Sequence, residues 1–239
     1  MKIGIIQTRG LGDIVIAAPI AMYYIERGCD IYWPIDSDFV DSFEYAFPKI
    51  NFIPVYKNET GINTSDYFYT RPKEILQNIS CNATLCLYSH LTGFDFGQGK
   101  LSDAISFDAY KYAIAKVPFS EKWKLKIKRN PLREAKLFEV LNLNPNENYA
   151  VIHDQGSVHN ANMDNLITPG TRNIKISAIT NNFLDWLGVI ENSDSAYLVN
   201  SVYSNLVEQM NMDIKKFLYI HTTSQWTPVF VNNWTYIHN

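Results

Sequence analysis

Residues 2–28, at the amino end of the chain, read KIGIIQTRGLGDIVIAAPIAMYYIERG, and this segment determines the fold. Its first part, Lys2–Thr8, is a short apolar run with β-branched residues, which is typical of a buried strand. A glycine-rich turn follows at Arg9–Asp13. The apolar residues after the turn recur with helical spacing as far as Arg27-Gly28, where glycine supplies a left-handed helix end. A strand, a glycine-rich turn and a helix in this order open a parallel α/β sheet.

The order of strand and helix continues along the first half of the chain. Residues 29–34, 51–57 and 83–89 read as strands, and residues 41–48 and 71–79 read as helices between them. A longer helical segment follows at 102–117. One sheet with covering helices accounts for this pattern.

A second series of strands and helices follows the proline-bounded, charge-dense stretch 118–131, which we interpret as a connection between two domains. We expect helices at 131–143, 182–193 and 201–211, a loop at 159–172, and strands at 149–153, 195–200 and, as the last one, 215–222. The sequence therefore predicts an α/β protein with two Rossmann-like domains, 1–128 and 129–239.

The charge pattern argues against broad binding to nucleic acid. The formal net charge is −3, and there is no long basic run. A local cluster at Lys122–Arg129 alternates basic and apolar residues, as one face of a strand or an extended linker would. We interpret it as a solvated edge, with a phosphate-binding patch as the alternative.

Cysteine usage and the amino end indicate a reducing compartment. The three cysteines, Cys29, Cys81 and Cys86, show no metal-ligand spacing, so we expect reduced thiols. The first residues lack the apolar region of a signal peptide, and no run of 18 apolar residues occurs. We therefore expect a cytoplasmic chain without a membrane span.

The turn Gly10-Leu11-Gly12-Asp13 is the strongest candidate for chemistry. Gly10 and Gly12 let the backbone approach a ligand closely, and free amides at a helix start favour negative charge. Asp13 has two readings: a carboxylate that caps the helix, or a carboxylate at the carboxyl edge of the sheet that acts as a base.

This segment resembles the amino terminus of the heptosyltransferase-like, family 9 glycosyltransferases. That family has a strand, a small-residue turn ending in Gly-Asp, and a helix with a Thr/Ala-Pro pair one turn later. Gly12-Asp13 and Ala18-Pro19 occupy those positions here. The resemblance implies a small GT-B-like fold, with two Rossmann-like domains facing across a cleft. It also implies that Asp13 deprotonates the acceptor hydroxyl.

Two later segments are similar to the donor side of the same family. The strand 149–153, followed by Gly156 and Ser157, looks like the strand and loop near the donor phosphates. The segment 196–206 looks like the later motif Asp-Thr-Gly-x-x-His-Leu. Asn200 stands there for the acid, Ser201 for Thr and Asn205 for His, and Ser204 lies between them. The resemblance makes these residues candidates for binding the donor, while Ser201 as a plain helix cap remains open.

The donor side departs from the family in one charge. No Lys follows Gly156-Ser157 closely to neutralise a diphosphate, and Arg172, Lys175 or the backbone amides are the candidates for that task. Asp36-Ser37-Asp38 has the spacing of a metal clamp, but we interpret it as a turn or helix cap. His153 ends a strand near Gly156, where a satisfied strand-end histidine is the favoured reading.

The resemblance implies a glycosyltransferase that moves a sugar from a nucleotide-sugar donor to an acceptor hydroxyl by metal-independent direct displacement. The partners are then a nucleotide-sugar and a saccharide or other hydroxyl acceptor, with no separate cofactor. Two alternatives stay open. The first is a non-catalytic protein that binds a nucleotide or a sugar phosphate. The second is an enzyme that glycosylates a nucleic-acid base, for which the Lys122–Arg129 cluster is the sequence support.

Overall fold

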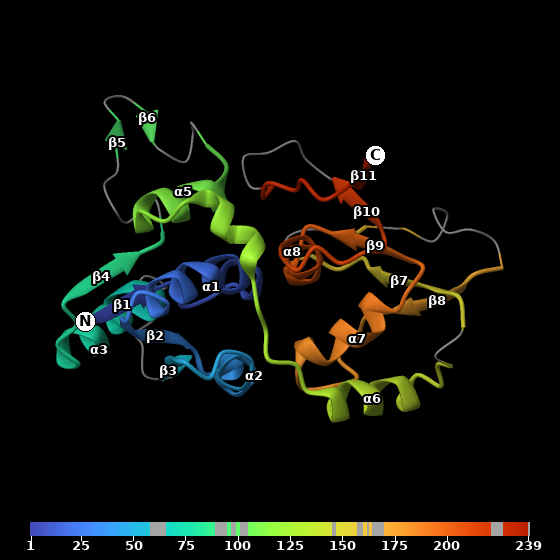
Figure 1. Cartoon of the computed structure of the whole chain (residues 1–239), viewed down its shortest axis with the longest axis horizontal. Coiled ribbons are helices and arrows are strands. Elements are labelled where there is room, and N and C mark those ends of the chain that lie inside the picture. Colours follow the sequence, from blue (N-terminus) through green and yellow to red (C-terminus); the bar gives the residue numbers. More distant parts are fainter. Residues whose placement is uncertain are drawn as a thin grey trace. The chain divides into compact units, whose positions relative to one another are not determined.

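The computed structural model divides the chain into two compact units. Unit 1 comprises Met1–Ile127 and Gln225–Val229, and unit 2 comprises Lys128–Ser224 and Phe230–Asn239. The structure describes residues 1–57, 66–88, 95–96, 99–100, 105–144, 147–156, 160–161, 163, 170–220 and 227–238. Each unit is a parallel sheet with helices, so the predicted α/β class and its Rossmann-like character are confirmed (Figure 1). The segment ending at Val229, which the expected boundaries put in the second half, groups with unit 1.

The sheet of unit 1 has the strand order β3-β2-β1-β4, and its pairings are parallel. The strands are β1 (Lys2–Ile6), β2 (Asp30–Asp36), β3 (Ile50–Val55) and β4 (Ala83–Cys86). The helices are α1 (Leu11–Ile25), α2 (Val40–Ala46), α3 (Arg71–Asn78) and α5 (Phe107–Ala115), with a π-helical turn at Asp66–Thr70 and 3₁₀ helices at Ser37–Phe39 and Phe119–Lys124. A short antiparallel pair, β5 (Asp95–Phe96) and β6 (Gly99–Lys100), precedes α5.

Strand order dictates where the helices of unit 1 pack. The steps from β1 to β2 to β3 run one way across the sheet, and the step from β3 to β4 runs back. Right-handed crossovers therefore put α3 on the opposite face from α1 and α2. Close packing of α3 on β1 requires the glycine at position 4, because a methyl group there would lie 2.7 Å from Leu76 Cδ1.

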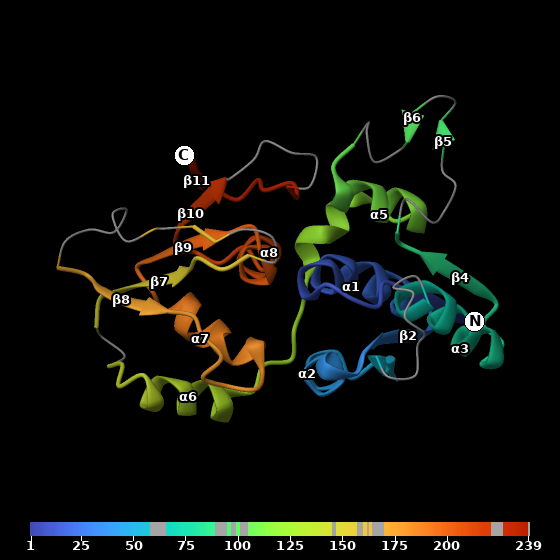
Figure 2. The same cartoon turned by 180° about the vertical axis from the view of Figure 1, so that it is seen from behind.

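Unit 2 has a five-stranded sheet of order β11-β10-β9-β7-β8, whose pairings are also parallel (Figure 2). The strands are β7 (Tyr149–His153), β8 (Arg172–Lys175), β9 (Ser195–Val199), β10 (Lys215–Ile220) and β11 (Trp234–His238). The helices are α6 (Pro131–Val140), α7 (Trp186–Glu191) and α8 (Val202–Gln209), and a 3₁₀ turn at Phe183–Asp185 leads into α7.

Two strands of unit 2 correct the sequence analysis. Arg172–Lys175 forms β8, although Arg172 was expected to end a loop, and β11 follows β10, which was expected to be the last strand. Both lie at the edges of the sheet. Ile174 is the one buried residue of β8, and β11 has none. Edge strands that bury so little lack the apolar run by which a strand is recognised in sequence.

The core of each unit is apolar and rich in aromatic rings. Trp33 on β2 is fully buried and donates its indole N–H to the carbonyl of Gln7 at 3.1 Å. Its ring packs against Phe52 on β3. In unit 2, Tyr197 of β9 and Phe217 of β10 stack with ring centroids 4.4 Å apart.

A buried ion pair fixes the return segment to unit 1. The side chains of Lys122 and Asp108 are both 0% exposed, and Lys122 Nζ lies 2.6 Å from Asp108 Oδ2. Lys122 also donates to the carbonyl of Val229, whose N–H donates to the same carboxylate oxygen at 2.9 Å. A charge removed from water needs such partners, and here backbone groups complete the set.

Burial of Lys122 corrects the interpretation of this one residue as part of a solvated edge, whereas Lys124, Lys126 and Lys128 are exposed, as that interpretation expects. The first part of the Lys122–Arg129 cluster forms a 3₁₀ helix rather than a strand, and Lys122 points into the core of unit 1. Lys124 pairs with Glu121. Arg129 pairs with Glu134 and Glu191. Most of the positive charge of the cluster is thus matched by acids of this chain.

Replacing Lys122 by Met should destabilise the protein by about 3–5 kcal/mol, because Asp108 keeps a buried charge without its counter-ion. Urea unfolding followed by circular dichroism measures the loss. Lys136→Met is the matched control, since Lys136 pairs with Glu139 on the surface and its removal should change stability little. Equal effects of the two substitutions would contradict the structural role of the buried pair.

Candidate functional site

The carboxyl edge of the first sheet holds the turn that the sequence analysis singled out. Gly10 precedes α1 as its N-cap residue, with φ of 81°. That backbone conformation favours glycine. Gly12 and Asp13 lie in the first turn of α1, where backbone amides have no partner within the helix. The positive end of the helix therefore lies at this edge, as predicted.

The carboxylate of Asp13 forms an ion pair and does not cap α1. No side chain accepts a hydrogen bond at the cap position of this helix. Asp13 Oδ1 instead lies 3.0 Å from Nζ of Lys111, and the Asp13 side chain is 37% exposed. The cap reading of Asp13 is therefore wrong, because Gly10 occupies the cap position and the carboxylate turns toward Lys111.

Lys111 on α5 brings a buried positive charge to this edge. Its side chain is 1% exposed, and its ammonium donates to Gln7 Oε1 at 2.7 Å and to the carbonyl of Leu87 at 3.4 Å. Gln7 follows β1 and Leu87 follows β4, which are neighbouring strands. The ion pair with Asp13 thus rests on the ends of two strands.

The other carboxylate oxygen of Asp13 lies over the turn. A methyl group built on Gly10 would lie 2.6 Å from Asp13 Oδ2, so a side chain at position 10 would displace this carboxylate as well as strain the backbone. The amides of Thr8 and Arg9 donate to the hydroxyl oxygen of Tyr88, at 3.0 and 3.3 Å. These contacts hold the start of the turn against the residues that follow β4.

In unit 2, the residues that follow β7 and β9 meet at one edge because these strands are neighbours. His153 ends β7, and its Nδ1 lies 3.0 Å from Oγ of Ser201, the residue that caps α8. The His153 ring also contacts the Tyr203 ring edge to face, with centroids 4.7 Å apart. Burial lowers the pKa of His153 to about 4, so the imidazole is neutral at neutral pH.

The first turn of α8 is built from polar side chains that hold one another. The backbone N–H of Ser201 donates to Ser204 Oγ at 2.9 Å, and Ser204 Oγ donates to the Ser201 carbonyl. Asn205 donates its amide to the same carbonyl at 2.8 Å. Ser201 therefore is a helix cap, as one reading had it. The Asn205 Oδ1 atom is buried without a hydrogen-bond partner in the described part of the chain.

A cation lies at the carboxyl edge of unit 2, beside the end of β7. Lys175 ends β8, and its Nζ lies 2.5 Å from Oδ2 of Asp154, the residue after β7. Its side chain is 55% exposed. Arg172 begins the same strand and is therefore at the opposite edge, where it binds Glu147 and the carbonyls of Leu141 and Asn142. Of these two basic residues, Lys175 is the one on the polar edge.

The structure thus collects the predicted residues into two groups. In unit 1, Gly10, Gly12 and Asp13 share the turn before and within α1. In unit 2, Ser201, Ser204 and Asn205 share the start of α8. Asn200, which is exposed, precedes them. Gly156 lies in the loop after β7, where Ala161 N–H donates to the Asp154 carbonyl at 2.8 Å, and Ser157 lies outside the described residues.

Sequence reasoning missed Lys111, Gln7 and Tyr88. Lys111 is far from Asp13 in sequence, and its contact depends on how α5 packs at the end of β1. One signal was present: Lys111 stands between Tyr110 and Tyr112, both buried, so the lysine occupies an inward stretch of its helix. A lysine in such a position needs partners inside the fold.

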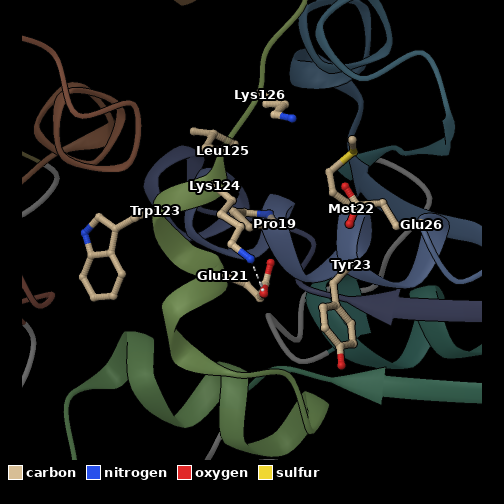
Figure 3. Close-up of a pocket in the computed structure, with 9 residues that line it drawn as sticks. All are labelled: Pro19, Met22, Tyr23, Glu26, Glu121, Trp123, Lys124, Leu125 and Lys126. Carbon is tan, nitrogen blue, oxygen red and sulfur yellow. Dashed lines mark hydrogen bonds and ion pairs between the residues drawn. The ribbon is translucent and has the colours of Figure 1, made fainter.

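A surface pocket lies elsewhere on unit 1 (Figure 3). It has a volume of about 370 Å³ and lies between the later part of α1 and the segment Glu121–Lys126. Tyr23 and Glu26 line one side, and the ion pair of Glu121 with Lys124 lies on the other. None of the residues predicted for catalysis or donor binding lines this pocket, whereas Lys124 and Lys126 of the Lys122–Arg129 cluster do.

Asp36 and Asp38 form a turn, as predicted. Asp36 Oδ1 accepts the N–H of Asp38 at 3.1 Å and caps the 3₁₀ helix that follows β2. Lys57 pairs with both carboxylates. The described residues contain no group of three His, Cys, Asp or Glu side chains arranged to hold a metal ion. Within the same part of the chain, no helix has the length and apolar character needed to cross a membrane.

The chain belongs to the α/β class: each of its two units has a Rossmann-like fold with a polar carboxyl edge, and open α/β sheets bind their ligands at that edge. Comparison of the sequence with protein-family models and with curated proteins gave no match. Comparison of the structure with solved structures gave matches.

The fold is that of family 9 glycosyltransferases and heptosyltransferases. The glycosyl transferase family 9 structure from Veillonella parvula aligns with a TM-score of 0.66 and 9% identity, over 100% of this chain and 86% of that one. Heptosyltransferase WaaC of E. coli, solved with ADP, aligns with a TM-score of 0.55 and 11% identity, over 100% of this chain and 91% of that one. E. coli ADP-heptose lps heptosyltransferase II aligns with a TM-score of 0.58 and 10% identity, over 99% of this chain and 90% of that one. The α/β fold implied by the sequence resemblance is therefore confirmed, and its structural neighbours are members of the family that the resemblance named.

Because His153 is held neutral, acidification should destabilise the protein in a defined window. The unfolded chain takes up the proton near pH 6.5 and the folded chain near pH 4, so stability falls as the pH drops between these values. The loss should reach on the order of 3 kcal/mol. His153→Asn, which retains a hydrogen-bonding group but does not titrate, should remove this part of the pH dependence. Urea unfolding from pH 7 to pH 4 measures both proteins, and unchanged pH dependence in the variant would contradict the shift.

Proposed function

We propose that the chain is a glycosyltransferase that moves a sugar from a nucleotide-sugar donor to an acceptor hydroxyl by direct displacement, without a metal ion. The observation that carries the proposal is the Asp13 carboxylate. It is partly exposed at the positive end of α1, and one of its oxygens is held by Lys111. The fold around it is one that heptosyltransferases share.

Unit 1 takes the acceptor in this proposal. Asp13 accepts the proton of the acceptor hydroxyl while the hydroxyl oxygen attacks the anomeric carbon of the donor. General-base catalysis of this kind contributes typically about 10²–10⁴-fold to a rate. Oδ2 is the oxygen for this task, because Oδ1 is occupied by the ammonium of Lys111.

Unit 2 takes the donor. As the new bond forms, the bond from the anomeric carbon to the diphosphate oxygen breaks, and negative charge builds up on the leaving group. In this proposal, amides at the start of α8 and the Ser201 hydroxyl bind that anion. Lys175 supplies the positive charge, in place of a lysine soon after Gly156.

One observation bears on the alternatives. The nucleic-acid alternative rested on the Lys122–Arg129 cluster, and Lys122, Lys124 and Arg129 are all engaged in ion pairs. The remaining alternative is a protein that binds a nucleotide sugar without turnover. The experiments below separate it from the transferase.

A nucleoside diphosphate should raise the melting temperature of the protein. ADP is the first probe, because WaaC was solved with ADP, and the uridine, guanosine and cytidine diphosphates complete the panel. A ligand at about 100 times its dissociation constant stabilises the folded state by about 2.7 kcal/mol. If none of the panel moves the thermal transition, both the transferase and the non-catalytic alternative are contradicted.

Asp13→Asn should keep nucleoside diphosphate binding and lose transfer. The amide cannot accept the proton, so release of nucleoside diphosphate from the matching nucleotide sugar, with saccharide acceptors present, should fall by about 10²–10⁴-fold. Asp41→Asn, on the surface of α2, is the control and should keep full activity. Binding without turnover in wild type, with Asp13→Asn indistinguishable from it, would favour the non-catalytic alternative.

Lys175→Met should weaken binding of the nucleoside diphosphate by roughly tenfold, with little effect on the nucleoside alone, because the ammonium contacts phosphate. Isothermal titration with ADP and with adenosine measures the difference. Lys215→Met is the matched control, since Lys215 is an exposed lysine at the amino end of β10, on the opposite edge of the same sheet. Equal losses for ADP in both variants would contradict a role for Lys175.

A further inference from the structure

The buried ammonium of Lys111 has a place in the fold that does not depend on Asp13. Gln7 Oε1 and the Leu87 carbonyl, both neutral acceptors, bind it at 2.7 and 3.4 Å. The rings of Tyr88, Phe107 and Tyr110 surround it, with centroids 5.4–5.9 Å from Nζ. Strand ends and aromatic faces together fix the position of this charge.

A lysine ammonium has three N–H donors, and two of them bind these neutral acceptors. The third points to Oδ1 of Asp13, at 3.0 Å. Ion pairing at a site anchored in this way selects one rotamer of the Asp13 side chain. Without Lys111, a carboxylate that is 37% exposed in the first turn of a helix would be free to choose among rotamers.

The same rotamer places Oδ2 against the Gly10 backbone. A side chain at position 10 would come within 2.6 Å of that oxygen, so glycine leaves the second oxygen uncovered on this side. The two carboxylate oxygens of Asp13 therefore have different surroundings: Oδ1 is held from within the fold by Lys111, and Oδ2 lies beside a residue without a side chain.

Stability alone is a weak reason for this arrangement. A buried ammonium carries a large desolvation cost, and apolar residues of similar volume often serve a fold equally well or better. The burial of Lys111 carries this cost, and its ammonium contacts a partly exposed carboxylate. An effect on that carboxylate therefore explains the buried lysine better than stability does.

We infer that Lys111 is a positioning residue for Asp13: it fixes Oδ1 so that Oδ2 faces the acceptor hydroxyl. This inference rests on the proposed function, because it assigns Asp13 the role of proton acceptor. Lys111 does not touch the substrate. Its effect on the rate passes through Asp13 alone.

The contact itself is tested without any substrate. In protein labelled with ¹⁵N-lysine, a buried, hydrogen-bonded ammonium exchanges its protons slowly enough to be seen by NMR, and Lys111→Met identifies the signal of Lys111. Asp13→Asn should shift and broaden that signal. The signal of Lys122, which pairs with Asp108 in the same unit, is the internal control and should not move. A Lys111 signal that is unchanged in Asp13→Asn would overturn the inference.

The role is tested by kinetics with the nucleotide sugar that gives turnover. Lys111→Met should lower kcat by about ten- to a hundredfold, as misplacement of a reacting group does, and leave the donor KM unchanged. In the Asp13→Asn background, the same substitution should cause no further loss. Lys216→Met is the matched control. Lys216 is a buried lysine of β10 that donates to the Met212 carbonyl, and its removal should leave kcat unchanged in the folded protein.

The outcomes distinguish the inference from the function on which it rests. Equal losses of kcat from Lys111→Met in both backgrounds would show a general structural effect and overturn the positioning role. Absence of turnover by wild type, with the NMR coupling intact, would refute the proposed function and the positioning role with it. Absence of coupling in an active wild-type protein would refute the positioning role alone.

Discussion

Parallel pairing of β1 with both β2 and β4 is the constraint on which the polar edge of unit 1 depends. It brings the residues after β1 and β4 together, and α1 begins at the same edge. An ammonium placed there meets Gln7 and Leu87 as well as Asp13. In an antiparallel pair, those strand ends would lie at opposite edges, and the three acceptors would not converge.

Unit 2 uses the same geometry with different chemistry. Its edge presents a neutral imidazole, serine hydroxyls and the amides of α8, with Lys175 beside them. Unit 1 presents a carboxylate backed by a buried cation. A carboxylate is suited to taking a proton, whereas amides, hydroxyls and a lysine are suited to holding an anion. The division of labour proposed for the two units follows from this difference.

The central strands and the first turn could be predicted from sequence because local signals specify them. β1 and β9 are nearly continuous apolar runs, and Gly10 through Asp13 mark a strand-to-helix turn. The edge strands β8 and β11 could not be predicted, since they bury too little to leave a pattern.

The partners of the charged groups could not be predicted from the sequence, for a different reason. Gln7 and Lys111 are 104 positions apart, and only the packing of α5 brings them together. Lys122 alternates with apolar residues as a strand would, yet it lies in a 3₁₀ helix that turns it inward. No local pattern reports such contacts. A lysine among buried residues indicates that it has a partner inside the fold, but it does not indicate which residue that partner is.

The crossing of the chain from unit 2 to Val229 and back has a consequence for how the halves can be exchanged. A fragment that ends at Ile127 would carry Asp108 and Lys122 without the backbone groups that complete their bonds. The second half, in turn, would carry a short stretch whose docking site had been left behind. The two halves of the chain therefore cannot be exchanged independently between proteins. A chimaera that takes its second half from another protein must also contain a segment equivalent to the one at Val229, which completes the bonds of the Lys122–Asp108 ion pair.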